Sequence, residues 1–431
     1  MVLSLAAQGV CLAKGPVEGE IIVRLRDGSD IAPVLVKHQL SLLGRFGTRP
    51  IFRLKVIGGA KVGDKINALL REYEVRSAEP NETYEVLEPT KNVAWAIGDP
   101  RPYAAQWFGP AIRLAEAHRI STGAGIRVAV LDSGVDRQHP ALAGRLLRGF
   151  DFVDYDTDPS EEGGTDNPSY GHGTHVAGLV ALVAPGARIL PLRILDATGM
   201  GNTWVLAEAM LHAVDPDGDP NTDDGAHIIN LSLSSLAKTQ LFKTAARLVS
   251  CRKGSLRGGQ PAAEDDDDED DDPGTDATVT FSDKVRCSGF GGAVVIAAAG
   301  NRGSDRIHEY PAAETSAALL SVAASDREGG LAAFSNFGWV KLAAPGDLIT
   351  SSVPGGGYGT WSGTSMAAPL VAGVAALLRS VDRRLEVDQV VKRLRSRGSS
   401  LCRTPLRQLD AARALGVDAP GERPDCSQPP K

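Results

Sequence analysis

A serine in a short run of small residues is the first candidate for chemistry in this chain. Ser365 lies within Gly363–Pro369, ahead of an apolar run that continues to Leu378 and predicts a buried helix. A serine hydroxyl attacks a carbonyl carbon when a histidine takes its proton and a carboxylate orients that histidine. A serine at a helix start is more often an N-cap, so the assignment depends on a base and a carboxylate elsewhere in the chain.

Two histidines in Gly171–Gly178 are candidates for the base. Small residues flank His172 and leave its ring open to a substrate, and imidazole changes charge close to neutral pH. His175 follows three residues later, on nearly the same face of a helix. The pair could instead hold a metal, although no third ligand of a suitable kind lies near it in the sequence. The residues alone do not rank His172 above His175.

The candidate carboxylate follows a predicted strand. Gly125–Leu131 is a short run of aliphatic residues, typical of a buried parallel strand, and Asp132 comes directly after it. Open α/β sheets place their site residues at this end of a strand. Asp136 is a second carboxylate nearby, and for either residue a turn is the structural alternative.

An asparagine beyond another predicted strand is a candidate for stabilising negative charge. Gly292–Ala299 predicts the buried strand, and Asn301 follows it. A side-chain amide at such a place can donate to a developing oxyanion, and removing a donor of this kind costs about 3–4 kcal/mol in barrier height. The alternative is an asparagine that forms a turn.

The order of predicted elements divides the chain into a small and a large part. Predicted strands at 21–25, 51–56 and 75–79 alternate with predicted helices at 31–43 and 62–73, which gives a small α+β unit without a serine, histidine and aspartate set. A polar connector with Pro100 and Pro102 follows it. The predicted division is a leader at 1–18, the small domain at 19–92, the large domain at 93–400 with an insertion at about 252–286, and a tail at 401–431.

Most of the net charge lies in one acidic run. The net charge is −7, and the nine consecutive acids at 264–272 supply more than all of it, so the remaining chain is near neutral. A near-neutral body gives no indication of nucleic-acid binding. No apolar run is long enough to predict a membrane span. Like charges repel, so we expect the run to be extended and solvated; calcium association or a basic partner are the alternatives.

The five cysteines leave two interpretations open. None lies in a CxxC motif or beside a histidine cluster, so we do not expect a zinc site. Two sequence-local pairs, Cys251–Cys287 and Cys402–Cys426, are one interpretation, and free buried thiols are the other. Residues 1–18 resemble a secretion signal without its positively charged start, and Cys11 is an alternative site for a lipid anchor.

Three stretches in a fixed order carry a resemblance to a known family. Asp132–Gly134, Gly171–Gly178 and Gly363–Pro369 resemble the subtilisin-like serine peptidases, which are also called subtilases or the S8 family. The resemblance covers roughly residues 104–395. It implies a three-layer α/β fold with a central, mainly parallel sheet, preceded by a small α+β propeptide domain. In that family the first histidine of the motif is the base, which selects His172 and assigns His175 to packing.

The resemblance also implies a reaction and its participants. A secreted serine endopeptidase would hydrolyse peptide bonds through Asp132, His172 and Ser365 by way of an acyl-enzyme. Asn301 would be the oxyanion donor, and the chemistry would require no cofactor. The protein would be made as a self-processing zymogen that is cut within 79–104. Its partners would be polypeptide substrates and its own propeptide as inhibitor, and we expect a monomer outside the cell or in the cell envelope.

A further stretch resembles the part of the family that binds the substrate. Ser232, Leu233 and Ser234 match the strand that pairs with an extended peptide through backbone hydrogen bonds. The family commonly has glycine at the position of Ser234, so the preference for the P1 residue stays open. A secreted location favours the disulfides Cys251–Cys287 and Cys402–Cys426.

A calcium site is expected in a different place from many relatives. The calcium-binding loop that many of them insert after Gly178 is missing. Asp215, Asp217 and Asp219 alternate around Gly218 and suit a hard cation such as calcium. Two prolines in the same segment make a rigid surface turn the alternative.

Two other functions share the triad pattern. An acyl-enzyme can also pass its acyl group to an amine, which would make the protein a peptide ligase or cyclase. An inactive, binding-only relative would normally have lost a triad residue, and all three are present here.

Overall fold

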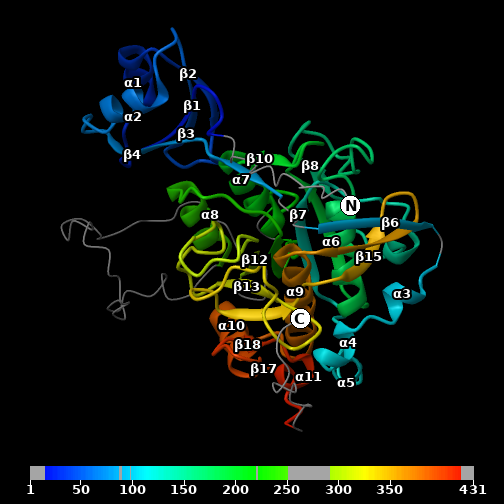
Figure 1. Cartoon of the computed structure of the whole chain (residues 1–431). Helices are drawn as coiled ribbons and strands as arrows, with labels where there is room; N and C mark the ends of the chain where they lie inside the picture. Colours follow the sequence, from blue (N-terminus) through cyan, green and yellow to red (C-terminus); the bar gives the residue numbers. More distant parts are fainter. Residues whose placement is uncertain (1–14, 87–89, 98, 220–221, 251–291, 419–431) are drawn as a thin grey trace, which may run out of the picture.

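The apolar runs predicted as strands form the centre of one large sheet. The computed structural model describes residues 15–86, 90–97 (backbone only), 99–219, 222–250 and 292–418. Nine strands hydrogen-bond in the order β17-β18-β14-β13-β12-β11-β7-β9-β8, and every pairing except that of β17 with β18 is parallel (Figure 1). Their bounds are β7 Arg127–Asp132, β8 Phe150–Asp151, β9 Arg188–Arg193, β11 Ile228–Leu231, β12 Val294–Ala298, β13 Leu319–Ser325, β14 Leu342–Pro345, β17 Ser399–Ser400 and β18 Arg407–Gln408.

Helices cover both faces of this sheet and give the predicted three layers. Val128 and Val130 of β7 belong to the core beneath one group of helices, whereas Ala129 and Leu131 belong to the core beneath the other. Alternate residues of one strand therefore enter different cores, which explains why the strand is apolar throughout. One group contains α6 (His172–Val183), α9 (Thr364–Val381) and α10 (Val387–Ser396), and the other contains α7 (Thr203–Val214) and α8 (Gln240–Ser250).

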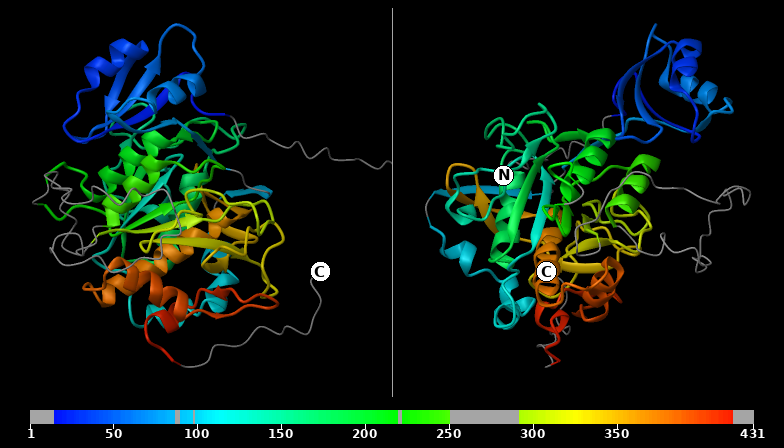
Figure 2. Two further views of the ribbon diagram at one scale, coloured as in Figure 1. Left: turned by 90° about the vertical axis from the view of Figure 1, so that its left-hand side faces the viewer. Right: turned by 180° about the vertical axis from the view of Figure 1, so that it is seen from behind.

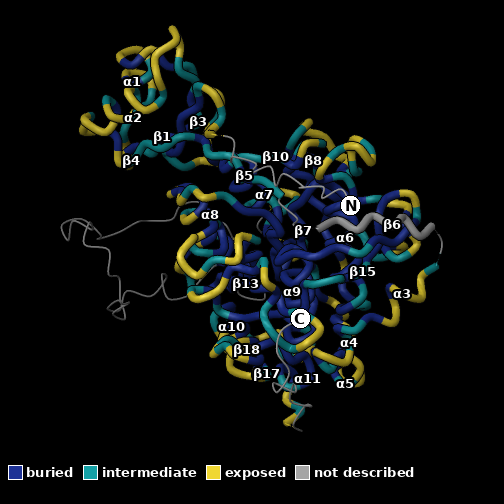
Figure 3. Tube along the Cα trace, in the orientation of Figure 1, coloured by how far each residue is buried: buried dark blue, intermediate teal, exposed yellow. Residues whose placement is uncertain are grey.

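The helix that begins next to Ser365 runs through the middle of the molecule. α9 is long and apolar enough to cross a membrane by length and composition, yet nearly all of it is buried inside the protein (Figure 3). Shorter elements complete the large domain: α3 (Arg101–Ala104), α4 (Phe108–Ala111), α5 (Leu114–His118), a 3-10 turn at Pro140–Leu142, β10 (Met200–Asn202), β15 (Ile349–Val353), β16 (Gly357–Ser362) and α11 (Ala411–Ala414).

A small α+β domain stands on one side of the large one (Figure 2). Its four strands are ordered β2-β3-β1-β4, with antiparallel pairing throughout. The elements are β1 (Glu20–Leu25), α1 (Ile31–His38), β2 (Leu40–Arg45), β3 (Ile51–Val56), α2 (Val62–Leu69) and β4 (Val75–Pro80). The predicted fold class, an α/β domain with a mainly parallel sheet behind a small α+β domain, is confirmed.

The small domain differs from the predicted element order at one place. The helix predicted over 31–43 ends at His38, because Gln39 adopts a left-handed conformation with φ 53°, and β2 begins at the next residue. The helix predicted over 62–73 is present but shorter, and it ends at Leu69. Leu42 and Leu43 have an apolar pattern that suits either state, so periodicity did not separate the helix from the edge strand.

The small domain packs on α7 and α8 with both apolar and polar contacts. Phe46 lies edge-on against Trp204, with ring centroids 5.9 Å apart, and Trp204 is almost completely buried. Asn81 accepts a hydrogen bond from the Trp204 backbone N–H at 3.1 Å. The carboxylate of Glu79 accepts the first N–H groups of α8, from Gln240 at 2.7 Å and Leu241 at 2.9 Å. These contacts join the two domains through helix ends that need hydrogen-bond acceptors.

A glycine lets α6 and α9 approach each other closely. A Cβ placed on Gly373 of α9 would lie 2.6 Å from the Cβ of Val183 on α6, closer than real Cβ contacts. The close packing of the helices that carry His172 and Ser365 therefore requires glycine, which has no side chain, at position 373.

We predict that Gly373→Ala lowers the free energy of unfolding by about 1–3 kcal/mol, because the added methyl group must displace a packed helix. Gly109→Ala is the matched control, since a Cβ added at Gly109 would meet nothing within 4 Å. Urea denaturation followed by circular dichroism measures both. Equal stabilities for the two variants would contradict the close packing of α6 and α9.

Candidate active site

The predicted carboxylate and base meet at one edge of the large sheet. Asp132 is the last residue of β7, and His172 is the first residue of α6; both are buried. Nδ1 of His172 and Oδ1 of Asp132 are 2.6 Å apart. The same carboxylate oxygen accepts the backbone N–H of Ser133 at 2.8 Å. A buried carboxylate in this position fixes the ring orientation and favours the tautomer with the proton on Nδ1.

The predicted nucleophile is tied to a neighbouring strand at the same edge. Ser365 is the second residue of α9, and its Oγ donates to the carbonyl oxygen of Ser232 at 3.3 Å. Ser232 returns a hydrogen bond from its own Oγ to the carbonyl of Ser365 at 3.0 Å. Ser232 directly follows β11, which pairs with β7. The carboxyl ends of two adjacent strands therefore position residues from α6 and α9.

The side chain of Asn301 is held in a fixed orientation. Its Oδ1 accepts hydrogen bonds from the N–H of Thr364 at 2.9 Å and from the Thr364 hydroxyl at 3.0 Å. The hydroxyl of Thr364 accepts the N–H of Gly300 at 3.0 Å. Because Oδ1 is committed to Thr364, the donor end of the amide is fixed as well. The residue next to Ser365 thus determines which way Asn301 presents its amide.

A glutamate that the sequence analysis missed holds the first turn of α6. Oε1 of Glu161 accepts the N–H of Thr174 at 2.9 Å, and Oε2 accepts the N–H of Gly171 at 3.2 Å. Oε2 also accepts the hydroxyl of Ser133 at 3.2 Å, and Ser133 Oγ accepts the N–H of Gly173 at 3.0 Å. The backbone donors that an isolated helix leaves unpaired are therefore satisfied on both sides of the catalytic-histidine candidate.

The protonation of Glu161 is coupled to its surroundings. Burial raises the pKa of Glu161 to about 7; the hydrogen bonds from Thr174 and Gly171 oppose this rise, and the nearby charge of Asp132 adds to it. No motif in the sequence marks Glu161, because it lies in a loop eleven residues before His172. Only the folded loop brings its carboxyl group to the helix start.

The second histidine has a different environment from the first. The ring of His175 is stacked on Trp361, with centroids 4.5 Å apart and planes 2° apart, and Nε2 lies 3.1 Å from the carbonyl oxygen of Gly359. His172 also lies near this indole, with centroids 6.0 Å apart. Asp132 contacts His172, and His175 packs in the core.

The predicted substrate-binding stretch already holds a peptide segment of the chain itself. Glu85 and Ser234 exchange two backbone hydrogen bonds of 3.0 Å in an antiparallel bridge. Glu85 ends β5 (Thr83–Glu85), which links the small domain to β10. Leu233 instead points its side chain into the core of the large domain. Ser234 is thus the member of the stretch that pairs with an extended strand, while Ser232 contacts Ser365.

Two acidic groups in the described part of the chain each bring three carboxylates close enough to contact one metal ion. Carboxylate oxygens of Asp215, Asp217 and Asp224 lie within 4.8 Å of one another, so Asp224 takes the place predicted for Asp219, whose backbone N–H donates to Asp217 at 2.8 Å. Burial and the neighbouring carboxylates raise the pKa of Asp215. Among the described residues no salt bridge reaches this group, which fits a hard cation such as calcium.

The second acidic group is already paired with a guanidinium. It consists of Asp151, Asp154 and Glu162. Arg193 reaches all three, at 2.5, 2.8 and 2.7 Å, and is itself almost completely buried. A positive charge from the chain fills the position that a metal ion would need.

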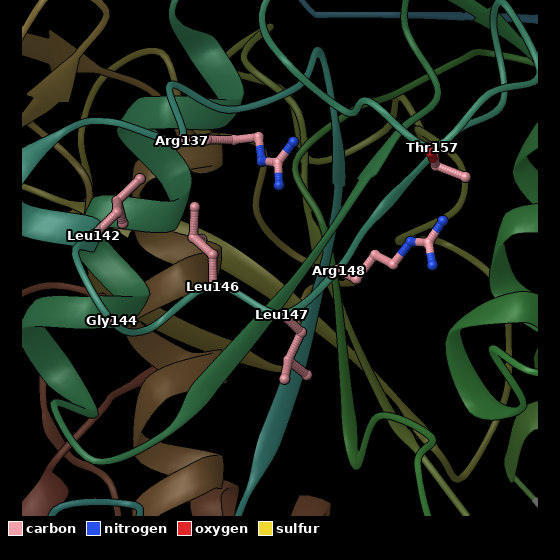
Figure 4. Close-up of a pocket in the computed structure, with 7 residues that line it drawn as sticks. All are labelled: Arg137, Leu142, Gly144, Leu146, Leu147, Arg148 and Thr157. Carbon is pink, nitrogen blue, oxygen red and sulfur yellow. The ribbon is translucent and has the colours of Figure 1, made fainter.

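An open hollow of about 560 Å³ is lined by Arg137, Leu142, Gly144, Leu146, Leu147, Arg148 and Thr157 (Figure 4), and it includes none of the predicted site residues.

Cys402 forms a disulfide bond. The other four cysteines lie outside the described residues, so the pairs Cys402–Cys426 and Cys251–Cys287 stay predictions, as does the state of the acidic run at 264–272.

We predict that Glu161 makes the stability of the protein fall with rising pH. A carboxyl group whose pKa is raised in the folded state stabilises the fold below its unfolded value near 4.5, and this contribution is lost as pH rises through about 7. The slope from one proton is at most about 1.4 kcal/mol per pH unit. Glu161→Gln cannot ionise and should flatten the stability curve between pH 4.5 and 7, measured by urea denaturation. Glu328→Gln, at an exposed position, is the control; identical slopes for wild type and Glu161→Gln would contradict the prediction.

Comparisons with known proteins identify the family of the chain. The model of the subtilase family matches residues 123–405, and the model of the fervidolysin N-terminal prodomain matches residues 13–81. The chain is 32% identical over 397 residues to the thermophilic serine proteinase of Bacillus sp. (strain AK1), covering 87% of this chain and 82% of the relative. It is 33% identical over 293 residues to thermitase of Thermoactinomyces vulgaris, covering 65% and 85%.

A solved structure gives the same result. A protease from Pseudoalteromonas arctica PAMC 21717 superposes with a TM-score of 0.58 at 27% identity, covering 74% of this chain and 98% of the other. The small domain described above coincides with the prodomain match, and the large sheet with the peptidase match. The chain therefore belongs to the subtilase family and is a subtilisin-like serine peptidase with an N-terminal prodomain.

Proposed function

We propose that this subtilase cleaves polypeptides internally with Asp132, His172 and Ser365 as its catalytic triad. The observation that supports this most is the 2.6 Å contact between Asp132 and His172 at the sheet edge where α9 begins with Thr364 and Ser365. With Nδ1–H donating to Asp132, Nε2 is the nitrogen that takes the proton of Ser365. The hydroxyl oxygen then attacks the scissile carbonyl carbon, and His172 returns the proton to the leaving amine. Water hydrolyses the acyl-enzyme by the same route.

The negative charge that develops on the carbonyl oxygen needs fixed donors. We assign this role to the side-chain amide of Asn301 and the backbone N–H of Ser365. Thr364 supports the assignment, because its two hydrogen bonds to Oδ1 of Asn301 orient the amide before substrate arrives. Donors that need no reorganisation during the reaction stabilise the transition state most.

The small domain is proposed to act as an inhibitory propeptide in a self-processing zymogen. β5 pairs with Ser234 where an extended substrate would lie on the amino-terminal side of the scissile bond. The next described strand, β6 (Thr90–Ile97), pairs with β16, which leads directly to Ser365. Because Glu85 pairs with Ser234 and Thr90 pairs with Ser362, we propose that the cleavage range of 79–104 narrows to the bonds between Val86 and Thr90.

The cellular context is proposed from the family and from one cysteine. A disulfide at Cys402 is typical of proteins outside the reducing cytosol. We propose a secreted or cell-envelope monomer with a leader at 1–18, an insertion at about 252–286 and a tail at 401–431. The cleavage range proposed above moves the boundary between the propeptide and the catalytic domain from 92/93 to within 86–90. Part of that tail is folded, because β18 joins the large sheet beside β14.

We predict that the full chain matures to a form whose first residue lies between 87 and 90, and that Ser365→Ala stays full length. Intact mass spectrometry of both proteins measures the cleavage. Incubation with casein tests activity on other polypeptides, and Thr315→Ala, a change at an exposed position, controls for general effects of substitution. Cleavage of Ser365→Ala at the same bond would contradict the assignment of the nucleophile. Joined peptides with little net hydrolysis would identify a ligase instead.

We predict that calcium stabilises the protein through Asp215, Asp217 and Asp224. Binding at a hundred times the dissociation constant adds about 2.7 kcal/mol, which raises Tm by a few degrees in a protein of this size. Scanning calorimetry with calcium or with EDTA measures the shift. Asp217→Asn should abolish it, whereas Asp154→Asn, in the group paired with Arg193, should retain it. The same shift in both variants would show that calcium binds elsewhere.

A further inference from the structure

The strand that follows the proposed cleavage point occupies a sheet edge next to the nucleophile. β6 runs antiparallel to β16, with Thr90 opposite Ser362, Lys91 opposite Trp361 and, after an irregularity, Ile97 opposite Gly357. The other edge of β16 is paired with β15. β16 therefore has one edge for a further strand, and in the precursor β6 fills it (Figure 1).

The two strands that flank the proposed cleavage point pair with two different segments of the large domain. Glu85 pairs with Ser234, two residues beyond the Ser232 carbonyl that Ser365 Oγ contacts. Thr90 pairs with Ser362, three residues before Ser365. Ser234 thus marks the side that binds residues before the scissile bond, and β16 marks the side that binds residues after it, here called the primed side.

A strand edge recognises any extended chain through its backbone. The N–H and C=O groups along such an edge pair with a peptide largely without regard to its side chains. After cleavage, β6 stays covalently attached to the large domain through the residues before α3. A tethered strand competes at the high effective concentration that a short linker gives, of the order of millimolar.

We propose that the edge of β16 is an extended primed-side binding strand for polypeptide substrates, and that β6 occupies it as a tethered competitor after the small domain has been removed. The inference rests on the proposed function and adds a substrate class, namely chains that continue for several residues beyond the scissile bond. Short substrates that end at this bond do not reach β16 and are not affected by β6.

The test compares two substrates with the same residues before the scissile bond. One ends there as a p-nitroanilide, and the other continues for eight further residues between a fluorophore and a quencher. The enzymes are matured full chains, whose retention of residues 90–97 is checked by intact mass. Loss of these residues during maturation would overturn the role of β6 as a tethered competitor.

Two neighbouring proline substitutions provide a matched pair. The N–H groups of adjacent residues in a strand point to opposite sides, so of Lys91→Pro and Asn92→Pro one removes a donor that faces β16 and the other removes a donor that faces away. We expect one variant to show about a tenfold lower KM for the long substrate, with unchanged kinetics on the p-nitroanilide. Equal effects of both variants, no effect of either, or a parallel change on both substrates would overturn the proposal.

An added peptide gives a measurement that does not depend on how these variants fold. The enzyme for this measurement is the proline variant that has lost a hydrogen bond to β16. A synthetic octapeptide with the sequence of residues 90–97 should competitively inhibit its cleavage of the long substrate and leave the p-nitroanilide reaction unchanged. The same peptide with alternate backbone nitrogens methylated should not inhibit. Inhibition by both peptides, or of both substrates, would overturn the proposal. Loss of p-nitroanilide hydrolysis in every form would instead refute the proposed function.

Discussion

The candidate active site depends on the contact between the carboxyl end of β7 and the first turn of α6. Asp132 and His172 are forty residues apart in sequence, and a single buried hydrogen bond of 2.6 Å joins them. Neither partner could be buried alone, because an unpaired carboxylate or an unsatisfied ring nitrogen in a dry site is costly. Asp132 belongs to the sheet and His172 to the helix. The distance between the two side chains therefore depends on how β7 and α6 pack against each other.

The helix starts make that packing polar as well as apolar. Glu161 and Ser133 accept the N–H groups around His172, and Thr364 fixes Asn301 beside the start of α9. Such acceptors satisfy donors that would otherwise be left unpaired inside the protein, and they restrict the position of each helix along its axis. In the small domain, Asn81 and Glu79 likewise accept backbone N–H groups at the starts of α7 and α8. Hydrogen bonds at their first turns therefore help to fix the positions of these helices.

Sequence reasoning identified the residues with local signatures and missed those that the fold brings together. Asp132 follows an apolar strand and Ser365 precedes an apolar helix, so both patterns were visible; His172 was separated from His175 only by resemblance to the family. Glu161 could not be found, because its partners are backbone groups. Asp224 replaced Asp219 in the acidic group because the turn at Gly218 redirects the chain. β2 was missed since an edge strand with one apolar side resembles an amphipathic helix over a few residues.

The guanidinium of Arg193 has a consequence for how the loop after β8 is held. Three carboxylates there share a cation that is part of the polypeptide and cannot dissociate into solution. Arg193 reduces their mutual repulsion without a dissolved cation, including in media that bind divalent ions strongly. The same loop continues to Glu161 and therefore to the start of α6. In this enzyme the geometry of the histidine is linked to a counterion that is encoded by the gene and does not have to be acquired from the environment.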